Sequence, residues 1–308
     1  MSATSGVLLV DKAAGLTSHD VVARARRRLG TRRVGHAGTL DPSATGLLVV
    51  LVEEATKLAP FLTAADKAYV AGVTFGRATD TLDADGTTVA TAPVPEPLVR
   101  EIEAASRGEA RDAWPRIAGA LDAEKAREEQ VPPAFSAIHV DGVRSHALAR
   151  SGAAPELAPR KVRLFEARVV GAHAERTTLD VEVEVEKGYY VRSFARDLGS
   201  SLGLPAHLSS LRRLRSGAFQ VEEAIPIEEA STARLISMET AIARAMPVLS
   251  VSPETERTFR HGKPVPRAPS DPEGHVAVLS AETGGLIAVA ESEDGVFRVV
   301  RGFSGRVA

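Results

Sequence analysis

The sequence predicts an α+β fold that combines a sheet and helices with a small β domain at the end. Two observations support this prediction. Short apolar or alternating segments, which are typical of strands, are interspersed with segments whose apolar residues recur at helical spacing. Near residue 246 the composition changes, and the last part of the chain holds prolines between short strand-like segments. We therefore expect one domain over residues 1–245 and a second over residues 246–308.

The first elements are a strand and a capped helix. Residues 6–10 (GVLLV) are a short apolar strand in this interpretation. Thr17 or Ser18 can cap the following helix, because each has a side-chain oxygen that accepts a hydrogen bond from the first turn. Gly30 suits the position just after that helix. The residues expected to face the core recur every four positions and are Val21, Ala25 and Leu29.

Further strands and helices follow along the chain. The segments with strand character are residues 46–52, 68–75, 162–170 and 178–186. The segments with helical character are residues 53–62, 97–129, 191–202, 208–214 and 226–245, with Pro115 interrupting the second. Residues 181–186 (VEVEVE) alternate with a period of two, which predicts a strand with one apolar and one acidic face.

The composition excludes several classes of protein. The 308 residues include no cysteine, so disulfides, thiolate metal sites and cysteine nucleophiles are ruled out. The eight histidines are scattered, without the paired pattern typical of a zinc site. The longest apolar runs, such as residues 47–52, are too short to span a bilayer, and no signal peptide is visible. We therefore expect a soluble cytoplasmic protein without a metal site.

Charge is unevenly distributed along the chain. The 38 lysines and arginines nearly balance the 40 acidic residues, which gives a formal net charge of −2. Residues 24–33 nevertheless hold six arginines in ten positions, and residues 212–215 read RRLR. Such clusters can give a protein of small net charge a positive face that binds a polyanion. The alternative is that the arginines line a solvated helix.

One loop has the features of a catalytic site. Residues 35–42 (GHAGTLDP) place a carboxylate, Asp41, after two glycines and before a proline. Pro42 fixes its own backbone and restricts Asp41 to extended geometry, so the carboxylate is presented on a rigid loop. Loops positioned by a rigid scaffold often carry catalytic groups. The alternative is that Asp41 and Pro42 only begin a turn.

Many further motifs follow one another over residues 6–230. The first are Asp11-Lys12-x-x-Gly15, the helix at Ser18, Gly35-His36-x-Gly38-x-Leu40-Asp41-Pro42 and Ala44-Thr45-Gly46-Leu47-Leu48. The later ones are Lys67-x-Tyr69, residues 79–86, Gln130 with residues 131–137, Gly188-Tyr189-Tyr190-Val191-Arg192-Ser193, Ala206-His207-Leu208 and Leu211-Arg212-Arg213. In order and spacing, these motifs resemble the TruB-type tRNA pseudouridine synthases. Residues 259–265 resemble part of the PUA-like RNA-binding module that many members of this family carry.

The resemblance implies a fold, an activity and a substrate. The fold is the pseudouridine synthase core, a mixed and largely antiparallel sheet flanked by helices, followed by a small C-terminal PUA-like β domain. The family isomerises uridine 55 in the TΨC loop of tRNA: the C1′–N1 bond breaks, the uracil turns, and C1′ is rejoined to C5. The implied enzyme needs no metal or cofactor. It acts as a monomer on the tRNA T-arm, without an obligate protein partner or a membrane.

By the same resemblance, three residues carry the chemistry. Asp41 is the essential carboxylate, and its step stays open among attack on C1′, attack on the base and removal of a ribose proton. Tyr69 stacks on the flipped uracil and can relay the C5 proton. Arg192 pairs with Asp41 and keeps the carboxylate ionised and aimed. The alternatives are a core aromatic for Tyr69 and a surface arginine at a helix start for Arg192.

The resemblance also implies residues that bind the substrate. His36 packs where the flipped base was stacked, and Tyr190 and Leu211 wall the base pocket; plain core packing is the alternative for all three. Asp83 contacts RNA or orders its own loop. The residues expected to bind phosphates are Arg212, Arg213, Arg150 and the arginines of residues 24–33.

The chain departs from the family pattern at a few positions. His139 and His146 stand where the thumb-like segment, about residues 130–152, usually has a lysine and a tyrosine. These histidines predict that closure of this segment on RNA depends on pH. Tyr189 stands where a threonine is usual.

Three other functions are less consistent with the sequence. An RNA-guided relative that works with partner proteins usually carries a basic tail, and no such tail is visible. A non-catalytic RNA-binding or tRNA-folding protein is disfavoured because Asp41, Tyr69 and Arg192 are all present. A phosphate-binding enzyme is disfavoured because the glycine patterns of nucleotide-binding loops are missing.

Overall fold

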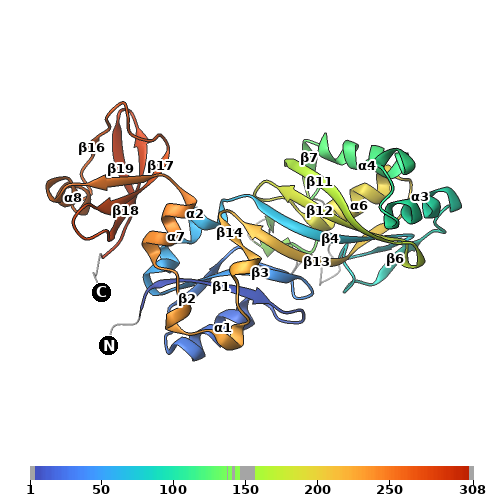
Figure 1. The fold of residues 1–308 in the computed structure, drawn as a ribbon, viewed down its shortest axis with the longest axis horizontal. Coiled ribbons are helices and arrows are strands. Elements are labelled where there is room, and N and C mark those ends of the chain that lie inside the picture. Colours follow the sequence, from blue (N-terminus) through green and yellow to red (C-terminus); the bar gives the residue numbers. More distant parts are fainter. Residues whose placement is uncertain (1–3, 137, 141–142, 146–156, 305–308) are drawn as a thin grey trace. The chain divides into compact units, whose positions relative to one another are not determined.

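The computed structural model describes residues 4–136, 138–140, 143–145 and 157–304, and the chain forms two compact units (Figure 1). Unit 1 consists of Met1–Asp41, Leu47–Ala65 and Ser216–Ala308, and unit 2 consists of Pro42–Gly46 and Asp66–Arg215. The domain boundary that the sequence suggests at residue 246 stays a prediction. Within the described residues, no helix has the length and apolar character needed to cross a membrane.

The first part of unit 1 is a group of buried strands. They are β1 (Gly6–Lys12), β2 (Val34–Ala37) and, from Leu47 onward, β3 (Thr45–Val52). β3 lies beside β1 and pairs antiparallel with β2. Nearly every side chain of β1 and β3 is buried, which explains why their sequences are continuous apolar runs rather than alternating ones. The 3₁₀ helix η1 (Glu53–Leu58) and helix α2 (Ala59–Thr63) follow β3.

Helix α1 (Ser18–Leu29) confirms the caps expected from the sequence. Thr17 is the N-cap: its hydroxyl oxygen accepts a hydrogen bond from the Asp20 N–H at 3.0 Å, and its own N–H donates to Asp20 Oδ2 at 2.8 Å. Gly30 ends the helix in the left-handed region, with a φ of 66°, where glycine has no steric penalty. In the predicted core stripe, Val21 and Ala25 are buried and Leu29 is half-buried.

The segment at residues 226–245 is less helical than its sequence predicts. It forms the 3₁₀ turns η5 (Ile227–Glu229) and η6 (Thr232–Arg234) and one α-helix, α7 (Met238–Ala245). Ile236 and Val7 of β1 exchange two backbone hydrogen bonds of 2.8 Å each. A backbone group that pairs with a strand cannot also complete a helical turn, so this pairing limits the helix.

The last part of unit 1 is a five-stranded sheet with its own apolar cluster (Figure 1, orange to red). The strand order is β15-β17-β18-β19-β16, and only β15 and β17 run parallel. Helix α8 (Pro253–Arg260) contributes Phe259 to the cluster. This sheet agrees with the predicted PUA-like fold. The strands are β15 (Val248–Val251), β16 (Val265–Pro266), β17 (His275–Ser280), β18 (Leu286–Glu293) and β19 (Val296–Gly302).

Unit 2 is built on a mixed sheet in which one pairing is parallel. The first residues of β3 pair in parallel with β13, where Thr45 is opposite Arg212 and Gly46 is opposite Arg213. The order continues from β13 through β4 and β12 to β11, and the β4–β12 and β12–β11 pairings are antiparallel. This arrangement confirms the mixed, largely antiparallel sheet. Its strands are β4 (Lys67–Phe75), β11 (Leu164–His173), β12 (Thr178–Val185) and β13 (Ala206–Ser216).

Strand β13 corrects the short helix that we expected at residues 208–214. Leu208, Leu211 and Leu214 recur every three residues, which imitates helical spacing. The segment is nevertheless a strand with neighbours on both sides, β3 and β4. The hydrogen-bonding edges of these neighbours outweigh the local pattern, as tertiary context commonly does for short segments.

Three helices and several short ribbons complete unit 2. The helices α3 (Glu96–Ser106) and α4 (Pro115–Lys125) contact β11, and α6 (Val191–Ser201) contacts α4 and β4. Pro115 begins α4, which confirms the predicted break. The ribbons pair β5 (Arg77–Thr79) with β6 (Thr88–Thr91), β7 (Glu129–Gln130) with β10 (Arg160–Lys161), and β8 (His139–Val140) with β9 (Val143–Arg144). The remaining short elements are η2 (Arg111–Ala113), η3 (Ala174–Arg176), β14 (Phe219–Gln220) and η4 (Val221–Glu223).

Candidate active site

The loop between β2 and β3 carries Asp41, and contacts on both sides of this residue fix it. The Ser18 hydroxyl at the start of α1 donates to the Leu40 carbonyl at 3.1 Å, and the Leu40 N–H donates to Ser18 Oγ at 2.9 Å. On the other side, a Cβ at Gly46 would lie 2.3 Å from the backbone oxygen of Arg213. Only glycine allows this approach, and its φ of 96° also favours glycine. Asp41 itself is half-buried.

His36 lies on β2 and meets a second histidine. The His36 and His19 rings are 5.8 Å apart, edge to face, at an interplanar angle of 85°. His36 is half-buried, whereas His19, in the first turn of α1, is exposed. Sequence reasoning assigned no role to His19, because seventeen positions separate the two rings and neither periodicity nor a motif connects them.

Tyr69 lies in the middle of unit 2, on β4. It is 8% exposed and is opposite Val183 of β12. Lys67 precedes it by two residues on the same strand, so both side chains point to the same face of the sheet. Burial and, to a lesser extent, the nearby Arg213 lower the pKa of Lys67 to about 8, against the opposing effect of Asp66. Lys67 therefore releases its proton more readily than an ordinary lysine.

Arg192 and Asp83 are brought together by the structure. Arg192 Nη1 lies 3.6 Å from Asp83 Oδ2, and both side chains are about nine-tenths buried. The same Nη1 donates to the Thr81 carbonyl at 3.1 Å, and Nη2 donates to the Phe135 carbonyl at 2.9 Å. The Arg192 guanidinium is thus held by two separate segments of the chain, which fixes its direction.

Asp83 organises the loop in which it stands. Its Oδ1 accepts hydrogen bonds from Thr81 Oγ1 at 2.6 Å and from the Asp85 N–H at 3.2 Å. Its carbonyl accepts from Thr79 Oγ1 at 2.6 Å. Of the two roles expected for Asp83, these contacts correspond to ordering the loop.

The remaining predicted residues lie at the start of α6 and on β13. Tyr190 is the N-cap of α6 and is half-buried. Leu211 is half-buried, and its carbonyl accepts from Thr45 Oγ1 at 3.4 Å. Arg212 is also half-buried, but Arg213 is fully buried. A phosphate on the surface cannot reach a fully buried guanidinium, so this burial argues against phosphate binding by Arg213.

The six arginines of residues 24–33 divide into two equal groups. In the first group, Arg24 pairs with Glu228 at 2.9 Å, Arg26 donates to the Val34 carbonyl at 3.0 Å, and Arg28 donates to the Ala230 carbonyl at 3.3 Å. The second group is exposed, and its side chains form no hydrogen bond or ion pair to any described residue. It consists of Arg27, Arg32 and Arg33, which we call the exposed arginine triad.

Two residues with clear contacts received no role from the sequence. Lys67 and Gln130 both occur in the quoted motifs, but neither is assigned a function there. The two-residue spacing of Lys67 and Tyr69 is a signal that could have identified Lys67, because it places both on one strand face. Gln130 gives no such signal: its side chain accepts a hydrogen bond from Tyr190, sixty positions later in the chain.

Some predictions fall where little or nothing is described. Arg150 and His146 lie outside the described residues, as does much of the thumb-like segment. His139 begins the short strand β8. Across residues 4–136, 138–140, 143–145 and 157–304, no group of three or more histidine, aspartate or glutamate side chains could hold a metal ion.

Comparisons with known proteins point in one direction. Residues 26–191 match a family model described as TruB family pseudouridylate synthase (N terminal domain). The tRNA pseudouridine synthase B of Rhodococcus jostii (strain RHA1) is 44% identical over 292 residues, which cover 91% of this chain and 91% of that protein. The tRNA pseudouridine synthase B of Thermobifida fusca (strain YX) is 39% identical over 307 residues, which cover 97% of this chain and 99% of that protein.

Solved structures resemble this chain in fold. A chain of a Cbf5–Nop10–Gar1 complex superposes with a TM-score of 0.71 at 24% identity, over 98% of this chain and 85% of that chain. A chain of an archaeal box H/ACA sRNP Nop10–Cbf5 complex superposes with a TM-score of 0.67 at 23% identity, over 99% of this chain and 88% of that chain. At this level of identity, the likeness concerns the fold alone.

Proposed function

Because this chain belongs to the TruB family of pseudouridylate synthases and is an isomerase that acts on tRNA, we propose that its target is uridine 55 of the TΨC loop and that Asp41 is its essential carboxylate. The observation that carries the proposal is the construction of the Asp41 loop. Ser18 and Gly46 fix this loop from both sides. A fixed, half-buried carboxylate is suited to act on a bound substrate.

The proposed reaction is an isomerisation without a co-reactant. The C1′–N1 bond breaks and a C1′–C5 bond forms; C5 loses its proton, and N1 gains one. The uracil must leave the T-loop stack before either bond can be reached, which costs about a few kcal/mol. Asp41 would attack C1′, attack the base or remove a ribose proton. In each route its carboxylate must be aimed, and we assign that task to Arg192.

The other side chains would hold the flipped uracil. We propose that Tyr69 stacks on it and relays the C5 proton, and that Tyr190 and Leu211 line the pocket. Tyr69 is suited to this task because its ring is almost fully buried on a central strand, so little freedom is lost when a base binds. His36 would pack where the flipped base had been stacked.

Phosphate contacts would supply much of the affinity for tRNA. We assign them to the exposed arginine triad and to Arg212. The triad is exposed and Arg212 is half-buried, whereas Arg213 is fully buried and cannot reach a phosphate. Replacing Arg27, Arg32 and Arg33 by glutamine should reduce the slope of log affinity against log salt by about two to three units, since each lost phosphate contact removes about 0.7–0.9. Arg24→Gln is the matched control, because Arg24 is already paired with Glu228; it should leave the slope unchanged.

We propose that the enzyme acts alone, as a cytoplasmic monomer, on the T-arm of tRNA. The superposable chains come from complexes with partner proteins, but the curated relatives that cover nearly the whole chain are named as tRNA enzymes. The C-terminal sheet would then be an accessory RNA-binding domain. Its role can be separated from catalysis by measuring binding and turnover independently.

The test uses T-arm RNAs that carry tritium at C5 of one uridine each, either uridine 55 or a neighbouring uridine. Tritium release reports loss of the C5 proton, and retention on a filter reports binding. Wild type should release label from uridine 55 alone. Asp41→Asn should bind the RNA within about threefold of wild type and release no label, because it keeps the shape of the side chain but cannot carry its charge.

Asp122→Asn is the control for this test, since it removes an exposed carboxylate that pairs with Arg111. It should behave as wild type. Release by Asp41→Asn would refute the role of Asp41, and release from another uridine would refute the target. Binding by wild type without any release would favour a tRNA-folding function instead.

A further inference from the structure

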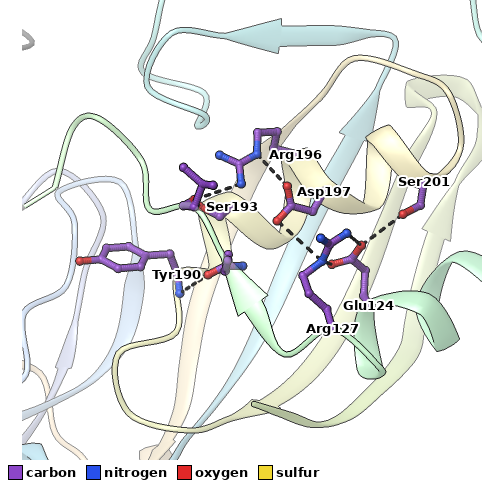
Figure 2. A network of polar contacts seen from close by, with 9 residues as sticks. Glu124, Arg127, Tyr190, Ser193, Arg196, Asp197 and Ser201 are labelled. Carbon is purple, nitrogen blue, oxygen red and sulfur yellow. Dashed lines mark hydrogen bonds and ion pairs between the residues drawn. The ribbon is translucent and has the colours of Figure 1, made fainter. Parts of the chain in front are cut away.

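A partly buried polar cluster lies against helix α6, whose N-cap is Tyr190 and whose first turn carries Arg192. Figure 2 shows its ion pairs and hydrogen bonds around α6. None of its members is required by the proposed reaction. We call it the α6 cluster, and it consists of Glu124, Arg127, Gln130, Tyr189, Asp197 and Ser201.

Gln130 is the member of the α6 cluster that contacts Tyr190. Its side chain is 2% exposed, and its Oε1 accepts a hydrogen bond from the Tyr190 N–H at 3.0 Å. Tyr190 is the N-cap of α6, and no side chain within that helix end caps it. In a capping box, the third helical residue accepts this hydrogen bond. Here that residue is Ser193, which donates to the Val131 carbonyl instead. Gln130, on the short strand β7, supplies the missing acceptor.

The orientation of the Gln130 amide follows from this contact. A backbone N–H can only donate, so Oε1 must face Tyr190 and Nε2 must face the other way. Nε2 is buried without a partner of good geometry, and so is the Tyr189 hydroxyl. Burial, followed by the charges of Glu124 and Asp197, raises the pKa of the Tyr189 phenol, while Arg127 and Gln130 act against this rise. The threonine that is usual at position 189 could not extend a phenol to this amide.

The far side of the α6 cluster is rigid. Glu124 is fully buried and accepts two hydrogen bonds from Arg127, at 2.9 and 2.8 Å, and one from Ser201 at 3.2 Å. Arg127 also lies 4.0 Å from Asp197, which accepts from Arg196 at 2.8 Å. Ser201 of α6 and Glu124 of α4 are therefore joined by a charge-assisted hydrogen bond, and Arg127 contacts both Glu124 and Asp197 (Figure 2).

The chain that follows Gln130 makes a second set of contacts with α6. The Val131 carbonyl accepts from Ser193 Oγ at 2.9 Å and from Arg196 Nη2 at 3.0 Å. The Phe135 carbonyl accepts from Arg192 at 2.9 Å. Residues 130–135 thus hold the first turn of α6 at its backbone, at Ser193 and at the Arg192 guanidinium, and Gln130 is the buried start of this strip.

We propose that Gln130 is a positioning residue: its amide fixes the backbone N–H of Tyr190, the N-cap of α6, and so sets the direction in which Tyr190 and Arg192 project. The proposal rests on the roles assigned to these two residues above. Loss of the Gln130 acceptor lets the first turn fray or rotate while the rest of α6 stays anchored by the α6 cluster. A shift of about 1 Å at a reacting group costs about a hundredfold in rate, whereas RNA affinity depends mainly on phosphate contacts elsewhere.

Two substitutions separate positioning from mere stability. Gln130→Met keeps the length and apolar volume but has no acceptor, and it should lower the single-turnover rate of tritium release by about 10–100-fold, with RNA affinity within about threefold of wild type. Gln130→Glu keeps an acceptor. Its introduced carboxyl would be buried beside Glu124 and Asp197, facing Arg127, Arg196 and Tyr189, so its charged form is the disfavoured one. Its rate, relative to wild type at the same pH, should rise as pH falls from 8.5 to 6.

Ser201→Ala is the control from the same cluster, since it removes one hydrogen bond to Glu124 at the far end. It should lower the melting temperature slightly and leave the rate unchanged. A wild-type rate for Gln130→Met would overturn the proposal. Equal rate losses in Gln130→Met and Ser201→Ala, or a Gln130→Glu rate ratio that does not change with pH, would also overturn it. If wild type isomerises a uridine other than 55, the proposed target fails, but the same comparison on that uridine still decides the role of Gln130.

Discussion

The loop that carries Asp41 and the helix that carries Arg192 are held in place by different kinds of contact. The loop depends on its own backbone, which Gly46 brings against β13 and which Ser18 bonds directly. Arg192 depends on its side chain, which reaches two carbonyls that are 57 and 111 residues away in the sequence. A backbone contact is lost through changes of conformation, whereas a side-chain contact is lost through changes of chemistry at one group.

The two regions are therefore sensitive to different kinds of substitution. In the Asp41 loop, a substitution that adds a single methyl group can move the carboxylate even though no polar contact is removed. At the start of α6, a side chain that cannot reach both carbonyls releases the guanidinium. The following predictions test this contrast, beginning with the largest effect.

Gly46→Ala should have the largest effect. Its Cβ would lie 2.3 Å from the Arg213 oxygen, at a φ of 96°. Strain and steric overlap together should cost about 3–5 kcal/mol of unfolding free energy, and tritium release should fall by more than about a hundredfold. Gly108→Ala is the matched control: its φ is 71°, but no atom lies within 4 Å of the added Cβ, so only about 1 kcal/mol should be lost. Chemical denaturation of both variants gives the difference, and equal losses would contradict a steric role for Gly46.

Arg192→Lys tests the side-chain half of the comparison. A lysine amine is a single point and cannot bond to the Thr81 and Phe135 carbonyls as the planar guanidinium does. The rate should fall by about 50–100-fold, while the free energy of unfolding should change by less than about 2 kcal/mol. Arg196→Lys, one turn later on α6, loses contacts to Asp197 and Val131 and should retain at least about a third of the rate. A larger rate loss in Arg196→Lys would mean that α6 as a whole, not Arg192, is the sensitive element.

The same contrast explains which parts of the molecule the sequence predicts well. The caps of α1, the break at Pro115 and the alternation of residues 181–186 depend on neighbours within a few positions, and the structure confirms all three. The strand at residues 208–214 depends on β3 and β4, which come much earlier in the chain. Its leucine spacing alone therefore led to a helix, which is wrong.

The candidate site divides in the same way. Asp41 could be singled out because Pro42 and the glycines that constrain it belong to one short motif. The contacts of Arg192 with Thr81 and Phe135, and the contact of Gln130 with Tyr190, join segments that are far apart in sequence. No periodicity or spacing predicts which carbonyl a side chain will reach across such a distance.

Two buried serines provide the finest test of the comparison, because each sits beside one of the two catalytic candidates. Ser18 makes two hydrogen bonds to Leu40, so Ser18→Ala leaves a buried N–H and a buried carbonyl unsatisfied and should cost about 2–3 kcal/mol. Ser193→Ala removes one hydrogen bond to the Val131 carbonyl, which Arg196 still satisfies, and should cost about 1 kcal/mol. Tritium release should fall about tenfold in Ser18→Ala and less than threefold in Ser193→Ala, measured at a temperature where both variants are folded. The reverse order would mean that the Asp41 loop tolerates backbone displacement better than α6 does, and the distinction between a backbone-held loop and a side-chain-held helix would have to be abandoned.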